Sequence, residues 1–186
     1  VTGHFGNWEV LGFTLATLGF PNTAIFRPLD NPYLNDYVTG LRERRGLRIL
    51  EKKGAATELD GMLDAKQAVS FIADQDAGRK GLFVDFFGRP ASTYKSIGLM
   101  AMRHEVPIIV GYARRLGKEY RVEIAVERII HPHEWETRDD PLRWITQTYT
   151  SALEAVIRRH PKQYLWAHRR WKHRPRGVPR PPDGIA

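Results

Sequence analysis

The chain has 186 residues, no cysteine and a formal net charge of +8. This length is typical of one domain, or of one domain with a tail, and it allows a buried hydrophobic core. The absence of cysteine excludes disulfides, thiolate metal sites and a cysteine nucleophile. The positive charge favours an anionic partner such as nucleic acid, phospholipid or a phosphorylated cofactor.

Predicted strands and helices alternate along the chain, which is typical of an α/β fold. The expected helices cover residues 8–18, 32–45, 56–66, 96–104 and 141–159. The expected strands cover residues 1–3, 23–26, 47–50, 69–73, 106–112 and 120–126, the last antiparallel to the one before it. A long loop is expected over residues 77–93, which are rich in glycine, arginine, lysine and phenylalanine. We therefore expect a mostly parallel (mixed) central sheet flanked by helices.

The predicted elements form one domain over residues 1–172, followed by a basic, proline-rich tail over residues 173–186 that we expect to be disordered. The longest apolar stretch, residues 106–113, is too short to span a bilayer. The chain begins at Val1 without a methionine, so we expect that a segment before it has been removed or was never recorded.

The most informative stretch is the turn around His4. Gly3 and Gly6 favour a turn, and Asn7 is a typical N-cap for the helix that follows. On a single helix, residues five apart such as His4 and Glu9 would point about 140° apart. They meet only if His4 lies in the turn and Glu9 lies in the first turn of the helix, and the local sequence is compatible with that geometry.

A carboxylate at Glu9 would then accept the ring N–H of His4, fix its tautomer and stabilise the imidazolium. His4 would be suited to removing a proton from a hydroxyl or an amine as a general base. The spacing alone is equally compatible with a histidine that caps backbone groups at a turn, with Glu9 as a surface residue.

Several stretches, in the same order, resemble blocks of the glycerolipid acyltransferase superfamily, and within it the branch of late lipid A acyltransferases (lauroyl and myristoyl transferases). They are Gly3–Glu9, Phe26–Pro32, Asp74–Asp76 with Val84–Thr93, Val106–Ile109 and Pro161–Trp171. The first resembles the His-x4-Asp/Glu block of that superfamily. The resemblance covers nearly all of residues 1–172. It implies a glycerolipid-acyltransferase-like fold and an amino-terminal membrane anchor, which we expect to precede Val1.

The resemblance implies an O-acyltransferase that moves a fatty acyl chain from a thioester of acyl carrier protein or coenzyme A to a hydroxyl of a lipid A precursor or related glycolipid. His4 would be the general base and Glu9 its orienting partner. No cofactor is expected beyond the acyl-thioester co-substrate. The expected partners are an anionic lipid acceptor and the membrane surface, at the cytoplasmic face of the inner membrane. Another phospholipid, glycolipid or aminolipid acceptor stays open.

Arginines are the candidates for binding substrate phosphate or the reaction's oxyanion. Arg27 follows a strand, near where ligands bind in open α/β sheets. Arg42 and Arg45, with Arg44, lie at the end of a helix, where the other interpretation is a solvated cation favoured by the helix dipole. Asp76 would orient one of these arginines through a bidentate pair, or belong to an ordinary loop after a strand.

Backbone amides are the other candidates for stabilising the oxyanion. Those around Gly6-Asn7 lie at the start of a helix, and those around Phe87-Gly88 lie in the predicted loop. Gly88 is accordingly expected to contact substrate.

Two further features have competing interpretations. His131 and His133 lack a third convergent ligand, so we expect loop residues and no metal. Residues 168–180 hold six Arg or Lys and no acid, which fits an anionic membrane surface with Trp166 and Trp171 at the interface. The same composition fits a basic nucleic-acid-binding module. Because no nucleic-acid motif occurs, we expect no nucleic-acid partner.

Overall fold

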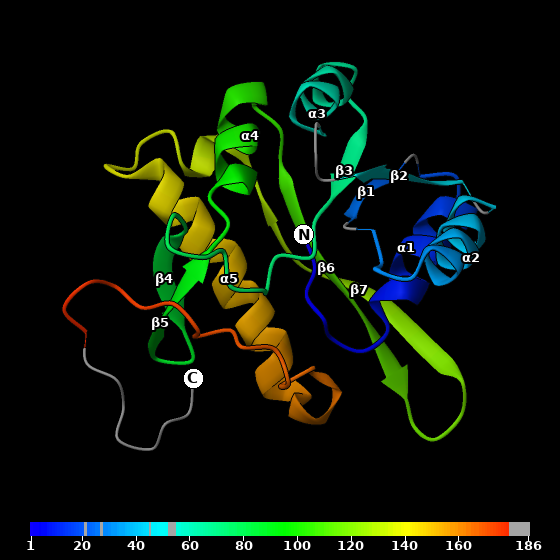
Figure 1. The fold of residues 1–186 in the computed structure, drawn as a ribbon. Coiled ribbons are helices and arrows are strands. Elements are labelled where there is room, and N and C mark those ends of the chain that lie inside the picture. Colours follow the sequence, from blue (N-terminus) through cyan, green and yellow to red (C-terminus); the bar gives the residue numbers. More distant parts are fainter. Residues whose placement is uncertain (21, 27, 45, 52–54, 179–186) are drawn as a thin grey trace. The chain divides into compact units, whose positions relative to one another are not determined.

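The computed structural model describes residues 1–20, 22–26, 28–44, 46–51 and 55–178. It is an α/β protein with a small parallel sheet, two antiparallel strand pairs and flanking helices (Figure 1), which confirms the predicted class. The contacts divide the chain into two compact units. Unit 1 comprises Val1–Gly6 and Ile72–Ala186, and unit 2 comprises Asn7–Phe71.

Unit 2 contains the parallel sheet, with strand order β2-β1-β3. Its elements are α1 (Trp8–Thr17), β1 (Asn22–Phe26), α2 (Pro32–Glu43), β2 (Leu47–Glu51), α3 (Ala55–Asp64) and β3 (Ala68–Ser70). Both of its first two helices begin at asparagine caps, as the sequence predicts. The side chain of Asn7 accepts from the amide of Val10 at 3.0 Å, and that of Asn31 accepts from the amide of Leu34 at 3.2 Å.

Unit 1 is built around one long helix. Its elements are β4 (Leu82–Phe86), β5 (Arg89–Thr93), α4 (Ser96–His104), β6 (Ile108–Leu116), β7 (Arg121–Ile130), α5 (Pro141–Arg159) and the short 3-10 turns η1 (Pro132–Glu134) and η2 (Pro161–Gln163). One face of α5 is buried, with Ile145, Tyr149 and Val156 almost fully enclosed, and it packs against β4, β6, β7 and α4 (Figure 1). This face forms the core of the unit.

The amino-terminal segment 1–6, which turns at His4, lies inside unit 1, between residues 72–73 and strand β6. The amide of Ala73 donates to the carbonyl of Thr2 at 2.9 Å, and the amide of Gly111 donates to the carbonyl of Val1 at 3.0 Å. Parallel bridges join Thr2 to Ile72 and Gly6 to Ala113. The residues around His4 are therefore held by backbone pairing on both sides.

The prediction of a long loop over residues 77–93 is wrong for its second half, where β4 and β5 form an antiparallel hairpin. The two-residue turn is Phe87-Gly88, and both residues have positive φ, 56° and 73°. This is the backbone that favours a tight hairpin, and Gly88 adopts it at little cost. Glycine and charged residues made the composition resemble a loop, although residues 84–86 alternate in burial as a strand does.

The strand predicted over residues 1–3 is reduced to an isolated bridge between Thr2 and Ile72, and the remaining predicted elements are confirmed with shifted ends. Strand β6 continues to Leu116 and β7 continues to Ile130, so their antiparallel pairing is longer than expected. Strand β3 is shorter than predicted and ends at Ser70. Within the described part of the chain, no helix combines the length and the hydrophobicity that crossing a bilayer requires.

Candidate active site

His4 and Asp74 form a doubly hydrogen-bonded pair in unit 1. The Nδ1 atom of His4 lies 2.7 Å from Oδ1 of Asp74, and the backbone amide of His4 donates to Oδ2 at 2.7 Å. The same carboxylate therefore holds both the ring and the backbone of His4. The Asp74 side chain is 1% exposed, whereas the His4 side chain is 14% exposed and reaches the surface.

The residues beside His4 explain why the carboxylate approaches so closely. A Cβ atom at Gly3 would lie 3.2 Å from Cγ and from Oδ2 of Asp74, tighter than ordinary contacts. Phe5 is buried and packs edge-on against Tyr112, with ring centroids 5.8 Å apart. A glycine on one side and a buried aromatic anchor on the other thus fix the position of His4.

The charge of this pair follows from its surroundings. Burial acts to raise the pKa of Asp74, but the hydrogen bonds and the positive charge that His4 offers outweigh burial, and the net pKa is lowered. Asp74 is therefore an ionised acceptor near neutral pH, and Nδ1 of His4 carries the proton. With the proton on Nδ1, Nε2 is the basic nitrogen of the His4 imidazole. The same carboxylate affects Tyr164, because burial, followed by the negative charge of Asp74, raises the pKa of the Tyr164 hydroxyl.

The lowered pKa of Asp74 makes part of the folding stability depend on pH. Because the carboxyl has a lower pKa in the folded chain, its contribution is present above the ordinary value of 3.8 and is lost as the pH falls through the lowered value. We expect the free energy of unfolding of the wild type to fall between about pH 5 and pH 3 more steeply than that of Asp74→Asn. Urea unfolding at a series of pH values measures both slopes, and equal slopes would contradict the coupling.

A second imidazole lies against the first. The rings of His4 and His168 meet edge to face, with centroids 4.2 Å apart. Burial, followed by the charge of His4, lowers the pKa of His168, while Asp74 acts in the opposite direction. The Nε2 atom of His168 is buried and has no hydrogen-bond partner among the described residues. His168 is therefore a neutral neighbour of His4 near pH 7.

Glu9 and Arg42, both predicted site residues, come together in unit 2. Arg42 donates from Nε to Oε2 of Glu9 at 2.9 Å and from Nη2 to Oε1 at 2.5 Å. This bidentate pair joins the first turn of α1 to the end of α2 and uses both carboxylate oxygens. Because His4 and Glu9 belong to different units, their pairing stays a prediction.

Asp76, for which the sequence allowed either an arginine partner or an ordinary loop role, pairs with His173. Its Oδ2 lies 2.6 Å from Nδ1 of His173 and accepts from the amide of Gly78 at 3.1 Å, and its Oδ1 accepts from the amide of His173 at 3.2 Å. Contacts with the domain thus include the first residue of the predicted tail, and residues 179–186 lie outside the described part. The boundary at residue 172 and a role for Asp76 toward substrate stay predictions.

The amides proposed near Gly88 already have acceptors. The amide of Gly88 donates to Oδ1 of Asp85 at 2.9 Å, and that of Phe87 donates to Oε2 of Glu154 at 2.6 Å. Likewise, the amide of Gly6 donates to the carbonyl of Gln163 at 2.8 Å. These contacts give both glycines a structural role, and a substrate contact of Gly88 stays a prediction. Arg27 and Arg45 lie outside the described residues.

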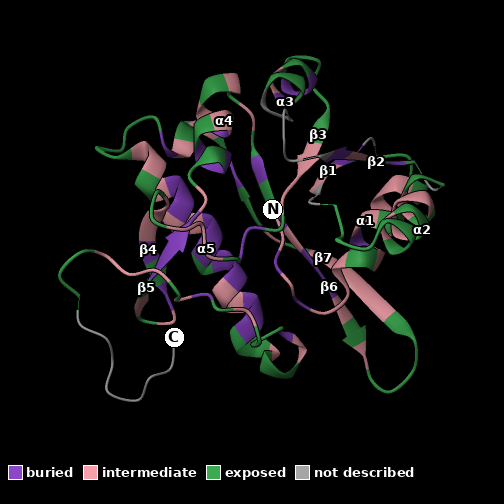
Figure 2. Cartoon of the chain, in the orientation of Figure 1, coloured by how far each residue is buried: buried purple, intermediate pink, exposed green. Residues whose placement is uncertain are grey.

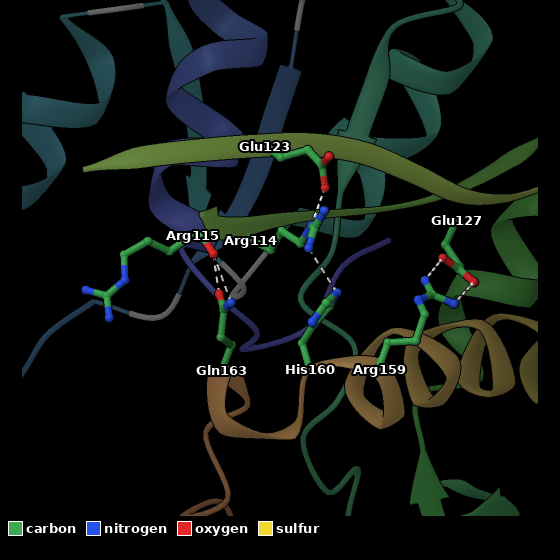
Figure 3. A network of polar contacts seen from close by, with 7 residues as sticks. All are labelled: Arg114, Arg115, Glu123, Glu127, Arg159, His160 and Gln163. Carbon is green, nitrogen blue, oxygen red and sulfur yellow. Dashed lines mark hydrogen bonds and ion pairs between the residues drawn. The ribbon is translucent and has the colours of Figure 1, made fainter. Parts of the chain in front are cut away.

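A polar network holds the end of α5 against the strands beside the amino-terminal segment (Figure 3). Gln163 accepts from the amide of Arg115 at 2.8 Å and donates to its carbonyl at 3.0 Å. Arg114 binds Glu123 on β7 and donates to Nε2 of His160 at 3.2 Å. Since the carbonyl of Gln163 accepts from Gly6, this network supports the turn that carries His4.

Sequence reasoning missed the partners of His4 that are distant in the chain. Asp74 lies 70 residues away, and its available signals were its place after a predicted strand and within a stretch that resembles a family block. His168 lies in the stretch Pro161–Trp171 that resembles a family block, but nothing in the sequence placed it beside His4. The stacked rings of His131 and His133, with centroids 5.5 Å apart, belong to the turn η1. Among the described residues, no group of three or more His, Cys, Asp or Glu is placed to hold a metal ion.

With this geometry in view, the comparisons point to one family. Residues 1–173 match the family described as bacterial lipid A biosynthesis acyltransferase. The chain is 30% identical to a lipid A biosynthesis lauroyltransferase of Escherichia coli over 166 residues, which is 86% of this chain and 51% of that protein.

Two other relatives give the same picture. The chain is 31% identical to an E. coli lipid A biosynthesis palmitoleoyltransferase over 94% of its own length and 55% of the relative's. It is 29% identical to a Haemophilus influenzae lipid A biosynthesis acyltransferase over 92% of its own length and 54% of the relative's. The chain thus spans about half the length of these relatives.

Proposed function

Since the chain belongs to the bacterial lipid A biosynthesis acyltransferase family, we propose that it transfers a fatty acyl chain from a thioester to a hydroxyl of a lipid A precursor or related glycolipid. The observation that carries the proposal is the pairing of His4 with Asp74, in which a buried carboxylate holds Nδ1 of a partly exposed imidazole. This is the arrangement that a general base requires.

The proton balance of the reaction fits one imidazole. A hydroxyl is far less acidic than an imidazolium, so Nε2 of His4 takes the proton while the oxygen attacks the thioester carbonyl. The C–S bond then breaks, and the same proton passes to the departing thiolate. The products are an ester and a thiol, and no acyl-enzyme is required. Asp74 stabilises the imidazolium that exists between the two proton transfers.

Glu9 stays in the proposal as a second carboxylate that acts on His4. Its spacing from His4 first suggested that it orients the imidazole, and its bidentate pair with Arg42 suggests that it also positions a guanidinium. Arg42, with Arg27 and Arg45, is proposed to bind acceptor phosphate or the developing oxyanion. Asp76 and Gly88 complete the proposed substrate-binding set.

The co-substrate, location and fold are also proposals. The donor is the thioester of acyl carrier protein or of coenzyme A, and no further cofactor is proposed. The acceptor is an anionic lipid, so the protein would work at the cytoplasmic face of the inner membrane. Family membership also favours a glycerolipid-acyltransferase-like fold.

Turnover by the purified protein tests the proposal. We expect incubation with an acyl thioester and a detergent-dispersed lipid A precursor to release free thiol and acylated lipid in a one-to-one ratio. Because the chain has no cysteine, a thiol reagent reports only the released thiol. Mass spectrometry of the lipid measures the added acyl chain. If neither free thiol nor acylated lipid forms with any donor, and the protein binds nucleic acid in a salt-sensitive way, the proposal is wrong. A basic nucleic-acid-binding module is then favoured.

A further inference from the structure

Helix α2 of unit 2 presents its apolar side to solvent. Its exposed residues include Tyr33 (86%), Tyr37 (66%), Leu34 (51%) and Leu41 (45%), and no residue of the helix is buried. Tyr33, Tyr37 and Leu41 are each four residues apart, so they form one stripe along the helix. Figure 2 shows α2 in the colours of exposed and intermediate residues only.

The opposite side of α2, which faces the rest of unit 2, is polar. Asn35 accepts from the amide of Leu29 at 3.0 Å, and Arg42 holds Glu9 of α1. Residues two apart on a helix point about 200° apart, so Asn35 lies opposite Tyr33, and half-buried Thr39 lies opposite Tyr37. A surface helix of a soluble protein normally has the reverse pattern. This helix is amphipathic with its apolar face outward.

Two properties of this face indicate what covers it. Tyrosine is favoured where an apolar region meets a polar one, because the ring is buried while the hydroxyl stays hydrated. Arg44, directly after the helix, continues the stripe of Tyr33, Tyr37 and Leu41 and is exposed. An apolar and aromatic face with an exposed arginine at one end is complementary to an anionic bilayer surface.

We propose that the stripe of Tyr33, Tyr37 and Leu41 on α2 docks onto the surface of an anionic phospholipid bilayer, with Arg44 near the phosphate groups. The choice of lipid rests in part on the proposed function, whose acceptor is a lipid. This assignment differs from the basic carboxyl-terminal residues that the sequence suggested, where Trp171 packs against Phe86 with ring centroids 5.7 Å apart.

The test is vesicle binding by Tyr33→Ser/Tyr37→Ser. Tyr120→Ser is the matched control, because Tyr120 is 80% exposed but lies in unit 1. Each protein is sedimented with vesicles of phosphatidylethanolamine and phosphatidylglycerol. We expect the affinity of the double variant for vesicles to fall by about tenfold or more, since two interfacial rings are lost. Tyr120→Ser should bind vesicles like the wild type. Thermal unfolding checks that the variants fold, and Leu41→Gln is the second variant should the double variant fail to do so.

The outcomes separate this inference from the proposed function, because vesicle binding needs no turnover. Acyl transfer to a detergent-dispersed acceptor should be unchanged in the double variant. Wild-type protein that does not bind the vesicles, or a double variant that binds as tightly as the wild type, overturns the inference. So does equal weakening by Tyr120→Ser. A wild-type dimer that becomes a monomer in the double variant, with vesicle binding intact, would assign this face to a second copy of the chain.

Discussion

Asp74→Asn is expected to lower kcat for acyl transfer by about 10³–10⁴-fold with little change in KM for the acceptor. An asparagine keeps the size of the side chain, and its carbonyl oxygen still accepts from the backbone amide of His4. Its NH₂ group then faces Nδ1, which must become an acceptor. The ring proton moves to Nε2, and the nitrogen that should remove the hydroxyl proton is blocked.

Steady-state kinetics with thioester and detergent-dispersed acceptor measure this loss, and thermal unfolding at neutral pH shows whether the variant is folded. A folded Asp74→Asn protein that keeps more than about a tenth of the wild-type kcat would remove Asp74 from the proposed mechanism. The residual rate should have a weaker dependence on pH, because the titrating base no longer acts.

The double-mutant cycle of Glu9→Gln and Arg42→Gln addresses the other carboxylate. Both oxygens of Glu9 accept from Arg42, so the two single variants should lower kcat for acyl transfer by similar factors. The double variant should lose little more kcat than either single variant. If Glu9→Gln instead lowers kcat far more than Arg42→Gln does, Glu9 acts on something besides the guanidinium. The orientation of His4 that the spacing suggested is then the leading explanation.

The sequence predicted His4 correctly as a residue in a turn before a capped helix, because those features are local. Gly3, Gly6 and Asn7 are local signals of a turn and a helix cap, and they can be read without the rest of the chain. The ring's partner was not predictable in this way. Asp74 reaches Nδ1 only because segment 1–6 pairs with residues 72–73, and this pairing depends on tertiary structure.

The same distinction explains the other differences. The cap of α2 at Asn31 and the antiparallel pairing of β6 with β7 follow local patterns, and both are confirmed. The β4–β5 hairpin was missed because its turn, Phe87-Gly88, places a non-glycine residue at positive φ, which propensity does not favour. Acceptors from Asp85 and from Glu154 of α5 stabilise that turn, and the second of these is distant in the sequence.

Gly6→Ala is expected to disable the protein by displacing the turn that carries His4. Gly6 has a φ of +57°, and a Cβ atom there would lie 1.8 Å from the carbonyl oxygen of Ala113. That oxygen belongs to the backbone of β6, so no side chain can rotate away to relieve the clash. The turn must leave the strand, and its hydrogen bond to the carbonyl of Gln163 and the contact between His4 and Asp74 would be strained with it.

Gly117→Ala separates the clash from the backbone conformation. Gly117 has a similar φ of +62°, but nothing lies within 4 Å of its ideal Cβ. Gly117→Ala should therefore cost about 1–2 kcal/mol from the left-handed conformation alone. Gly6→Ala should cost about 3–5 kcal/mol, because overpacking is added. For a chain of this size the melting temperature should fall by about 2–8 °C in Gly117→Ala and by about 6–20 °C in Gly6→Ala. Thermal unfolding followed by circular dichroism measures both. Equal shifts in melting temperature would mean that strand β6 moves to accommodate the methyl group. Acyl transfer by such a Gly6→Ala protein would show that the tight approach of the turn to β6 is not needed to place His4.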